Sequence, residues 1–186
     1  MKKFTFMALF LILSLSILLA ACGESAIEKA DGKTDDSKAS EDKDKGKEEK
    51  SKDKETENLK VGETVTFDGV DITLNEARIE PGGEFDEPEN EQFIVVNLTA
   101  ENNTDEEVTM SSMMNVELYD DEGYNYSTTI LTEGAKGQFD GSVPAGNKLR
   151  GEIPFDVPKS DAYELHFSDP FQSGKAIWKI TADELK

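Results

Sequence analysis

The one cysteine of the 186-residue chain, Cys22, stands where a covalent lipid would be attached. It follows a positively charged start (1–3) and an apolar run (4–19), and the small residues Ala20 and Ala21 directly precede it. This order is typical of a bacterial lipoprotein signal peptide, with cleavage between Ala21 and Cys22. Because two acyl chains give stable attachment whereas one gives only marginal binding, a diacylglycerol on Cys22 suffices as an anchor. The sequence therefore predicts a lipid-anchored protein on the outer face of the cytoplasmic membrane.

The other nucleophilic and metal-binding side chains are sparse. A single cysteine that carries lipid leaves no thiol for a disulfide, a zinc site or a nucleophile. His166 is the sole histidine, and its alternation with Leu165 and Phe167 predicts a solvated position on the polar face of a strand. The sequence contains no phosphate-binding loop of the G-x-x-x-x-G-K-[ST] type. We therefore predict no catalytic residues, no metal ligands and no cofactor.

Three acidic clusters in predicted loops offer the oxygen ligands that Ca²⁺ prefers. They are Glu84, Asp86, Glu87, Glu89 and Glu91; Asp105, Glu106 and Glu107; and Asp120, Asp121 and Glu122. The D-x-[DN]-x-[DN]-G order is missing, and the third cluster with Gly123 is also what a tight hairpin turn requires. Turns on a solubilising surface are therefore our first interpretation, and a calcium-dependent binding module is the alternative. A cell-wall glycosidase, which would use paired carboxylates, comes third because no aromatic-lined cleft is evident.

A methionine cluster, Met110-Ser111-Ser112-Met113-Met114, provides thioethers of the kind that bind Cu(I). Methionine also fills irregular gaps under loops, and no second soft cluster or neighbouring histidine supports a copper site. We therefore interpret these residues as packing.

Composition divides the chain into three parts. Residues 1–21 form the signal peptide, 22–58 a disordered charged linker anchored at Cys22, and 59–186 a folded domain. The linker contains one large apolar residue, Ile27, and so cannot bury enough surface to offset its chain entropy. As a flexible coil of about 36 residues it would span roughly 30 to 36 Å.

Nearly all of the net charge of −20 lies on the domain, where 27 acidic residues face 8 basic ones between Val61 and Lys186. Such a domain repels nucleic acid and gains nothing from lying on an anionic membrane. We therefore expect a partner, an envelope protein or other ligand, that presents a basic patch.

Apolar residues of the domain alternate with period two, which predicts strands with one buried face. The main runs are Val70–Leu74, Ile94–Ala100, Val116–Leu118, Leu149–Val157, Tyr163–Phe167 and Trp178–Ile180. Phe93 and Val95 make one strand apolar on both faces, so we expect it at the centre of a sheet, whereas Pro154 marks an edge or a bulge. Turn clusters separate these runs, and no stretch favours an amphipathic helix of three turns. The pattern predicts an all-β, two-sheet antiparallel sandwich.

Three segments resemble a known family. They are Gln92–Thr104, a strand ending in Asn-Asn-Thr; Val116–Gly123, a strand ending in Asp-x-x-Gly; and Val143–Pro158, which has Pro-x-Gly before Gly-x-x-x-Phe-x-Val-Pro. In this order they are similar to the telokin-like lipoprotein domain of Gram-positive bacteria, a domain of unknown function, and to the mycobacterial immunoprotective extracellular antigen. The resemblance implies an immunoglobulin-like fold, secretion and anchoring, with no catalytic residues to carry over. We expect a non-catalytic, surface-anchored immunoglobulin-like module that binds or supports another envelope component.

Overall fold

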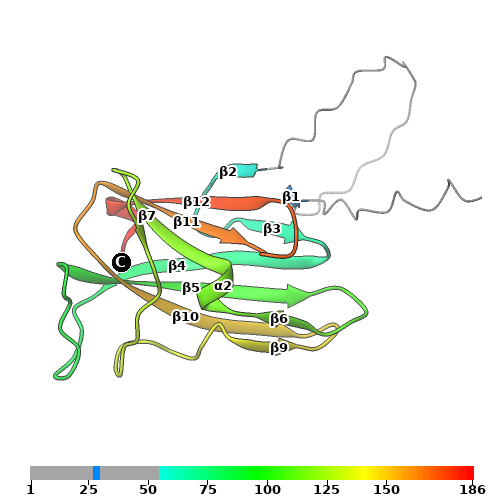
Figure 1. Cartoon of the computed structure of the whole chain (residues 1–186), viewed down its shortest axis with the longest axis horizontal. Coiled ribbons are helices and arrows are strands. Elements are labelled where there is room, and N and C mark those ends of the chain that lie inside the picture. Colours follow the sequence, from blue (N-terminus) through cyan, green and yellow to red (C-terminus); the bar gives the residue numbers. More distant parts are fainter. Residues whose placement is uncertain (1–26, 30–54) are drawn as a thin grey trace, which may run out of the picture.

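The computed structural model describes residues 27–29 and 55–186 (Figure 1). The predicted cleavage site at Ala21, the lipid site at Cys22 and most of the predicted linker lie outside the described residues. No described helix is long and apolar enough to cross a membrane.

Two five-stranded sheets pack face to face, as predicted (Figure 1). The first sheet has the spatial order β1 (Ile27–Lys29), β3 (Thr64–Phe67), β4 (Val70–Glu80), β5 (Gln92–Asn102) and β10 (Lys148–Val157). The second has the order β2 (Glu55–Leu59), β12 (Lys175–Thr181), β11 (Ala162–Ser168), β7 (Val116–Asp120) and β8 (Asn125–Tyr126). A separate ribbon pairs β6 (Val108–Met110) with β9 (Gly141–Val143).

Helix is almost absent from the described residues, as the sequence predicted. The one α-helix within 27–29 and 55–186, α2 (Ser112–Asn115), is a single turn, and a 3₁₀ turn, η1 (Ala182–Glu184), follows β12. The β-branched and aromatic residues that fill the strands favour a pleated surface over a helix.

The core lies between the sheets, where the inward residues of each alternating run are buried. In β12, for example, Ala176, Trp178 and Ile180 are fully buried while Lys179 is exposed. The Phe67 and Phe167 rings meet edge to face across the two sheets, with centroids 5.2 Å apart. This packing joins β3 of the first sheet to β11 of the second.

The positions predicted for β5 and Pro154 are confirmed. β5 lies between β4 and β10, and its outward residues Phe93 and Val95 are buried, at 4% and 0% exposure. Phe93 is covered because the loop after β4 folds over it; Gly82, at a φ of +81°, approaches its ring. Pro154 stands in the edge strand β10, where a missing N–H costs no ladder hydrogen bond.

Two strands depart from the expected pattern. β2 pairs in parallel with β12, so the second sheet is not wholly antiparallel. β1 and most of β2 also lie within residues 22–58, which the sequence analysis assigned to a disordered linker. Their polar composition hid them because strand pairing uses backbone hydrogen bonds, which need no apolar side chains.

A tyrosine corner closes the connection into β11. The Tyr163 hydroxyl donates to the carbonyl of Pro158, five residues earlier, at 2.6 Å and accepts from Gln92 at 3.0 Å. A buried tyrosine bonded back to its own connection is a feature of immunoglobulin-like sandwiches.

Candidate functional site

An apolar groove of about 580 Å³ opens at one end of the sandwich, between the two sheets. Its floor includes the paired rings Phe67 and Phe167 together with Val70 and Ile72 of β4. Three further segments form its walls: residues 104–110, helix α2 and the turn at 169–172. The groove therefore combines residues that lie about 100 positions apart in the chain.

The turn at 169–172 holds a phenylalanine out toward solvent. The Asp169 carboxylate accepts a hydrogen bond from the Phe171 N–H at 2.8 Å, and its carbonyl accepts from the Gln172 N–H at 3.1 Å. Phe171 is nevertheless 89% exposed. A large apolar side chain on a fixed, exposed turn is typical of a contact surface.

The methionine cluster supplies a second wall. Met110 is buried in the core and Met114, on α2, is 56% exposed; both line the groove, whereas Met113 is 82% exposed outside it. Helix α2 is held by Asp140, which accepts from the Ser112 N–H and hydroxyl at 2.9 Å each. The prediction that these methionines fill gaps is right for Met110 alone. The other two are exposed, because the one-turn helix directs them away from the core.

Asn102 explains the Asn-Asn-Thr ending of β5. Its side chain is fully buried; the amide nitrogen donates to the carbonyls of Glu106 at 2.7 Å and Val143 at 2.8 Å. Its amide oxygen accepts from the N–H and hydroxyl of Thr104. Asn102 thereby fixes the loop 103–107 that forms one side of the groove.

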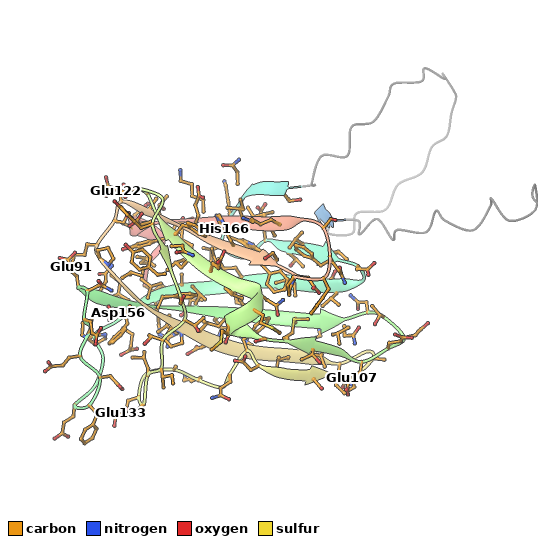
Figure 2. The ribbon with its side chains drawn as sticks, viewed as in Figure 1. Glu91, Glu107, Glu122, Glu133, Asp156 and His166 are labelled. Atoms are coloured by element: carbon orange, nitrogen blue, oxygen red, sulfur yellow. The ribbon has the colours of Figure 1, made fainter. Side chains whose placement is uncertain are left out.

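Carboxylates surround the apolar floor. Asp68, Glu106 and Glu107 are exposed at the rim, and Asp169 is half-buried beside Phe171. Figure 2 shows Glu107 at the opposite end of the sandwich from Glu91 and Glu122. The groove thus places an apolar surface within a negative rim, an arrangement that attracts cations and repels anions.

One polar atom of the groove is left without a partner. The side-chain oxygen of Gln172 is buried and accepts no hydrogen bond from any described residue. A buried acceptor without a donor costs free energy, so a ligand N–H placed here would be favoured.

The third acidic cluster forms the predicted hairpin turn. Asp120 is 8% exposed and accepts from the N–H groups of Glu122 and Tyr124 and from the Tyr126 hydroxyl, at 2.7 to 3.0 Å. Burial alone would raise the pKa of Asp120, but these hydrogen bonds outweigh it and lower the pKa. Burial and the neighbouring Asp120 raise the pKa of Tyr126 to about 12. Gly123 has a φ of +87°, as the turn requires.

In the first acidic cluster, a carboxylate is likewise bonded to a neighbouring loop of the protein. Asp86 accepts from the hydroxyl and N–H of Thr132 at 2.5 and 2.8 Å, and the hydroxyl contact in particular lowers the pKa of Asp86. Within residues 27–29 and 55–186, no three histidine, cysteine, aspartate or glutamate side chains are grouped to hold a metal ion. The carboxylates that are ordered here therefore organise loops.

His166 is less solvated than predicted. Its side chain is only 12% exposed, because the ring stacks on Tyr119 with centroids 4.2 Å apart. Its Nε2 lies 3.2 Å from Glu164, and Nδ1 is buried without a partner among the described residues. The prediction of the strand face is right, but the prediction of a solvated ring is wrong, because the Tyr119 side chain on β7 covers the His166 ring.

A second polar site lies along β10, outside the groove. Residues 128–139, which we call the edge strap, follow the free edge of β10 from a bridge between Thr128 and Phe155. The Glu152 carboxylate accepts from Arg78 at 2.9 Å and the Lys136 N–H at 2.7 Å, among other donors. Burial would raise the pKa of Glu152, but these bonds outweigh it and lower the pKa.

The edge strap also closes the core. Phe139 is fully buried, and the backbone of residues 138 and 139 passes so close to Gly151 that an added Cβ would lie 2.3 Å from it. The side chains of this site bind the protein's own backbone, which gives the site a structural role.

Residues 59–177, more than half of the chain, match the family model of a domain of unknown function, DUF4352. The chain belongs to the DUF4352 family. This agrees with the resemblance inferred from the strand endings, whose three segments lie within the matched range. No protein with a curated description matches the chain.

Solved structures share the sandwich of this DUF4352 domain. It is similar to YcdA, a candidate lipoprotein of Bacillus subtilis, with 17% identity and a TM-score of 0.51 over 61% of this chain and 37% of YcdA. It is also similar to YjhA of Bacillus subtilis, with 16% identity and a TM-score of 0.50 over 65% of this chain and 98% of YjhA. The secreted protein MPT63 of Mycobacterium tuberculosis has 14% identity and a TM-score of 0.44 over 62% of this chain and 83% of its own. The match spans little more than a third of YcdA, and at these identities it shows the fold alone.

Sequence reasoning missed the groove as a site. Of its acidic rim, only the loop that holds Glu106 and Glu107 was singled out, and Phe171 was not singled out at all. The available signal was a large apolar residue within a turn-forming stretch, Asp169-Pro170-Phe171-Gln172-Ser173-Gly174. A phenylalanine there has no strand neighbour with which to share a buried face.

Proposed function

We propose that this protein is a lipid-anchored, extracytoplasmic binding module without catalytic activity, and that its groove binds a partner segment in which basic residues flank an apolar one. The observation that carries this proposal is the pairing of an exposed Phe171 and an apolar floor with a rim of four carboxylates. A partner of the opposite pattern would bury the apolar surface and place its cations at the rim.

The chemistry of the groove favours binding over catalysis. No histidine, cysteine or lysine is among the side chains that line it, and its carboxylates stand at the rim. The unpartnered oxygen of Gln172 would accept an N–H from a peptide backbone or a basic side chain. A binding role uses each of these features, whereas a hydrolase would leave Phe171 unexplained.

The extracytoplasmic location rests mainly on the signal sequence that ends at Cys22. The similarity of the domain to YcdA, a candidate lipoprotein, also supports an extracytoplasmic location. In the chain with Cys22→Ala, we expect labelled fatty acid to be absent and the protein to stay unprocessed or leave the membrane. Equal labelling of the variant and the native protein would contradict the anchor.

A pair of synthetic peptides tests the groove. We would titrate the full chain, carrying Cys22→Ser, with Lys-Lys-Phe-Leu-Lys-Lys and with Glu-Glu-Phe-Leu-Glu-Glu. The basic peptide should bind, more weakly as salt rises, and the acidic peptide should not. Equal binding of both peptides would overturn the proposal.

Charge reversal at the rim provides the matched control. Glu106→Lys with Glu107→Lys should abolish binding of the basic peptide, yet leave the fold intact, because the loop is held by the Glu106 carbonyl and not by its carboxylate. Glu87→Lys with Glu89→Lys makes the same change of charge in the loop between β4 and β5, away from the groove. If both double variants weaken binding equally, the peptide senses net charge and not the groove.

A further inference from the structure

The short strand β6 has one paired edge and one open edge. It pairs on one side with β9, and these two strands form a sheet of their own. Beyond this pairing, no backbone N–H or C=O group of residues 108–110 bonds to another described residue. Because alternate residues of an antiparallel strand turn both backbone groups toward the same side, at least one residue of β6 directs its N–H and C=O away from β9.

The open edge of β6 faces the groove. Val108, Thr109 and Met110 all line the groove, whereas none of the described residues 141–143 of β9 does. Side chains of consecutive strand residues point to opposite faces, so a groove that met only one face of β6 would contact alternate residues. Contact with three consecutive residues indicates that the groove runs along the edge of the strand.

The charge beside this edge determines which kind of strand could join it. An open edge invites pairing with another strand, and proteins commonly protect such edges with charged residues. Glu106 and Glu107 directly precede β6 and are exposed at the rim. They would repel a second copy of this chain, whose net charge is −20, and would attract a segment that carries basic residues.

A further acceptor in the groove favours an extended partner over a helical one. The buried side-chain oxygen of Gln172, on a different wall of the groove, accepts no hydrogen bond from any described residue. An extended segment presents N–H groups at both of its edges, so it can donate to β6 on one side and to Gln172 on the other. A helix uses most of its N–H and C=O groups internally and would leave the edge of β6 unpaired.

We propose that the partner segment lies in the groove as an extended strand and pairs with the open edge of β6, so that the β6–β9 ribbon gains a third strand. The paired backbones then supply affinity, while the apolar floor and the acidic rim select an apolar residue flanked by basic ones. This inference rests on the proposed function, because it concerns the same groove and the same partner segment. It adds the pairing of the two backbones.

Backbone methylation of a peptide tests the pairing separately from side-chain contacts. The full chain with Cys22→Ser would be titrated with Lys-Lys-Phe-Leu-Lys-Lys and with two forms of it that carry the same side chains. One form is N-methylated at its second and fourth residues, the other at its third and fifth. Since the N–H groups of an extended strand point alternately to its two edges, only one form loses the N–H groups that face β6. We expect that form to bind about tenfold more weakly than the other.

The outcomes separate the pairing from the proposed function. Equal affinity of the two methylated forms would overturn the pairing. If both also bind as tightly as the unmethylated peptide, the groove binds through side chains alone and the proposed function stands. Absence of binding by the unmethylated peptide would contradict the proposed function and the pairing together.

Amide hydrogen exchange measured by NMR tests the same pairing on the protein. At a concentration of the unmethylated peptide about ten times its Kd, the β6 amide that faces the groove should exchange about tenfold more slowly. The amides of β8, whose residues 125 and 126 lie outside the groove, should keep their rates. Unchanged exchange throughout residues 108–110 would overturn the pairing. Protection that rises with protein concentration in the absence of peptide would also overturn it, because the edge would then bind a second copy of this chain.

Discussion

The edge strap and the groove both contain apolar side chains, but Phe139 of the strap is covered by the fold and Phe171 of the groove is exposed. At the β10 edge the protein's own chain covers the opening: Phe139 is fully buried and Glu152 binds the strap backbone. At the groove, Phe171 and Met114 remain 89% and 56% exposed, although the turn and helix that carry them are firmly hydrogen-bonded. The strap is part of the packed fold, and the contrast supports our proposal that the exposed groove binds a partner.

The largest effect should come from filling the close approach at the strap. Gly151→Ala would place a Cβ 2.3 Å from the backbone of residues 138 and 139. Since backbone cannot rotate away as a side chain can, we expect a loss of about 3 kcal/mol in the free energy of unfolding, measured by urea denaturation. Gly123→Ala is the control: it meets nothing within 4 Å, and only its left-handed φ should cost about 1 kcal/mol. Equal losses would refute the special role of the strap.

Removing the charge at Glu152 should lower the free energy of unfolding somewhat less than Gly151→Ala does, and should change how that free energy depends on pH. The folded state lowers the pKa of Glu152, so its contribution is complete above the ordinary glutamate range and disappears as pH falls through the folded pKa. Glu152→Gln should therefore lose about 2 kcal/mol at neutral pH and little more in acid. The native protein should lose stability over the same fall in pH.

Denaturant midpoints at neutral and acidic pH would measure this difference. Glu101→Gln is the matched control, because its bond to Lys148 joins two exposed side chains and should contribute less than about 1 kcal/mol. If the two variants behave alike, Glu152 does not hold the strap.

At the groove, removal of an exposed side chain should weaken binding of the basic peptide and leave the stability of the fold unchanged. Phe171→Ser removes a side chain that the domain hardly buries, so the unfolding midpoint should not move. Affinity for the basic peptide should fall about tenfold, as expected for an aromatic side chain that is buried on binding. Ile130→Ser, at a residue 84% exposed and outside the groove, should leave both quantities unchanged. A loss of stability in Phe171→Ser would mean that this residue belongs to the fold.

The smallest effect should come from calcium. Because Asp120 and Asp86 already accept hydrogen bonds from their own loops, millimolar Ca²⁺ should shift the melting temperature by less than about 1 °C. A saturable shift that disappears with Asp120→Asn and Asp121→Asn would instead favour the calcium-dependent alternative.

Local sequence patterns were sufficient for three predictions: the sandwich from period-two alternation, the central β5 from apolar residues on both of its faces, and an edge or a bulge at Pro154. Each of those features depends on residues close in sequence, such as Phe93 beside Ile94 or the missing N–H of Pro154. β1 and β2 escaped prediction because backbone pairing leaves no mark on side-chain composition.

The groove and the strap were not predictable for a different reason. Glu152 reads as an outward polar residue of a strand, and only the fold brings Arg78 and Lys136 onto it. Phe171 likewise becomes part of a groove only when β11 packs against Phe67. Such sites depend on contacts between residues far apart in the sequence, which local periodicity cannot predict.

Photo-crosslinking in cells tests the central claim, that the groove contacts a partner, most directly. A benzophenone side chain would replace Phe171 in one protein and Ile130 in another, which are similarly exposed, and only Phe171 lines the groove. We predict one defined adduct from position 171, none of matching yield from position 130, and a crosslinked peptide with Lys or Arg beside an apolar residue. Equal capture at both positions, or an acidic peptide at position 171, would contradict the account.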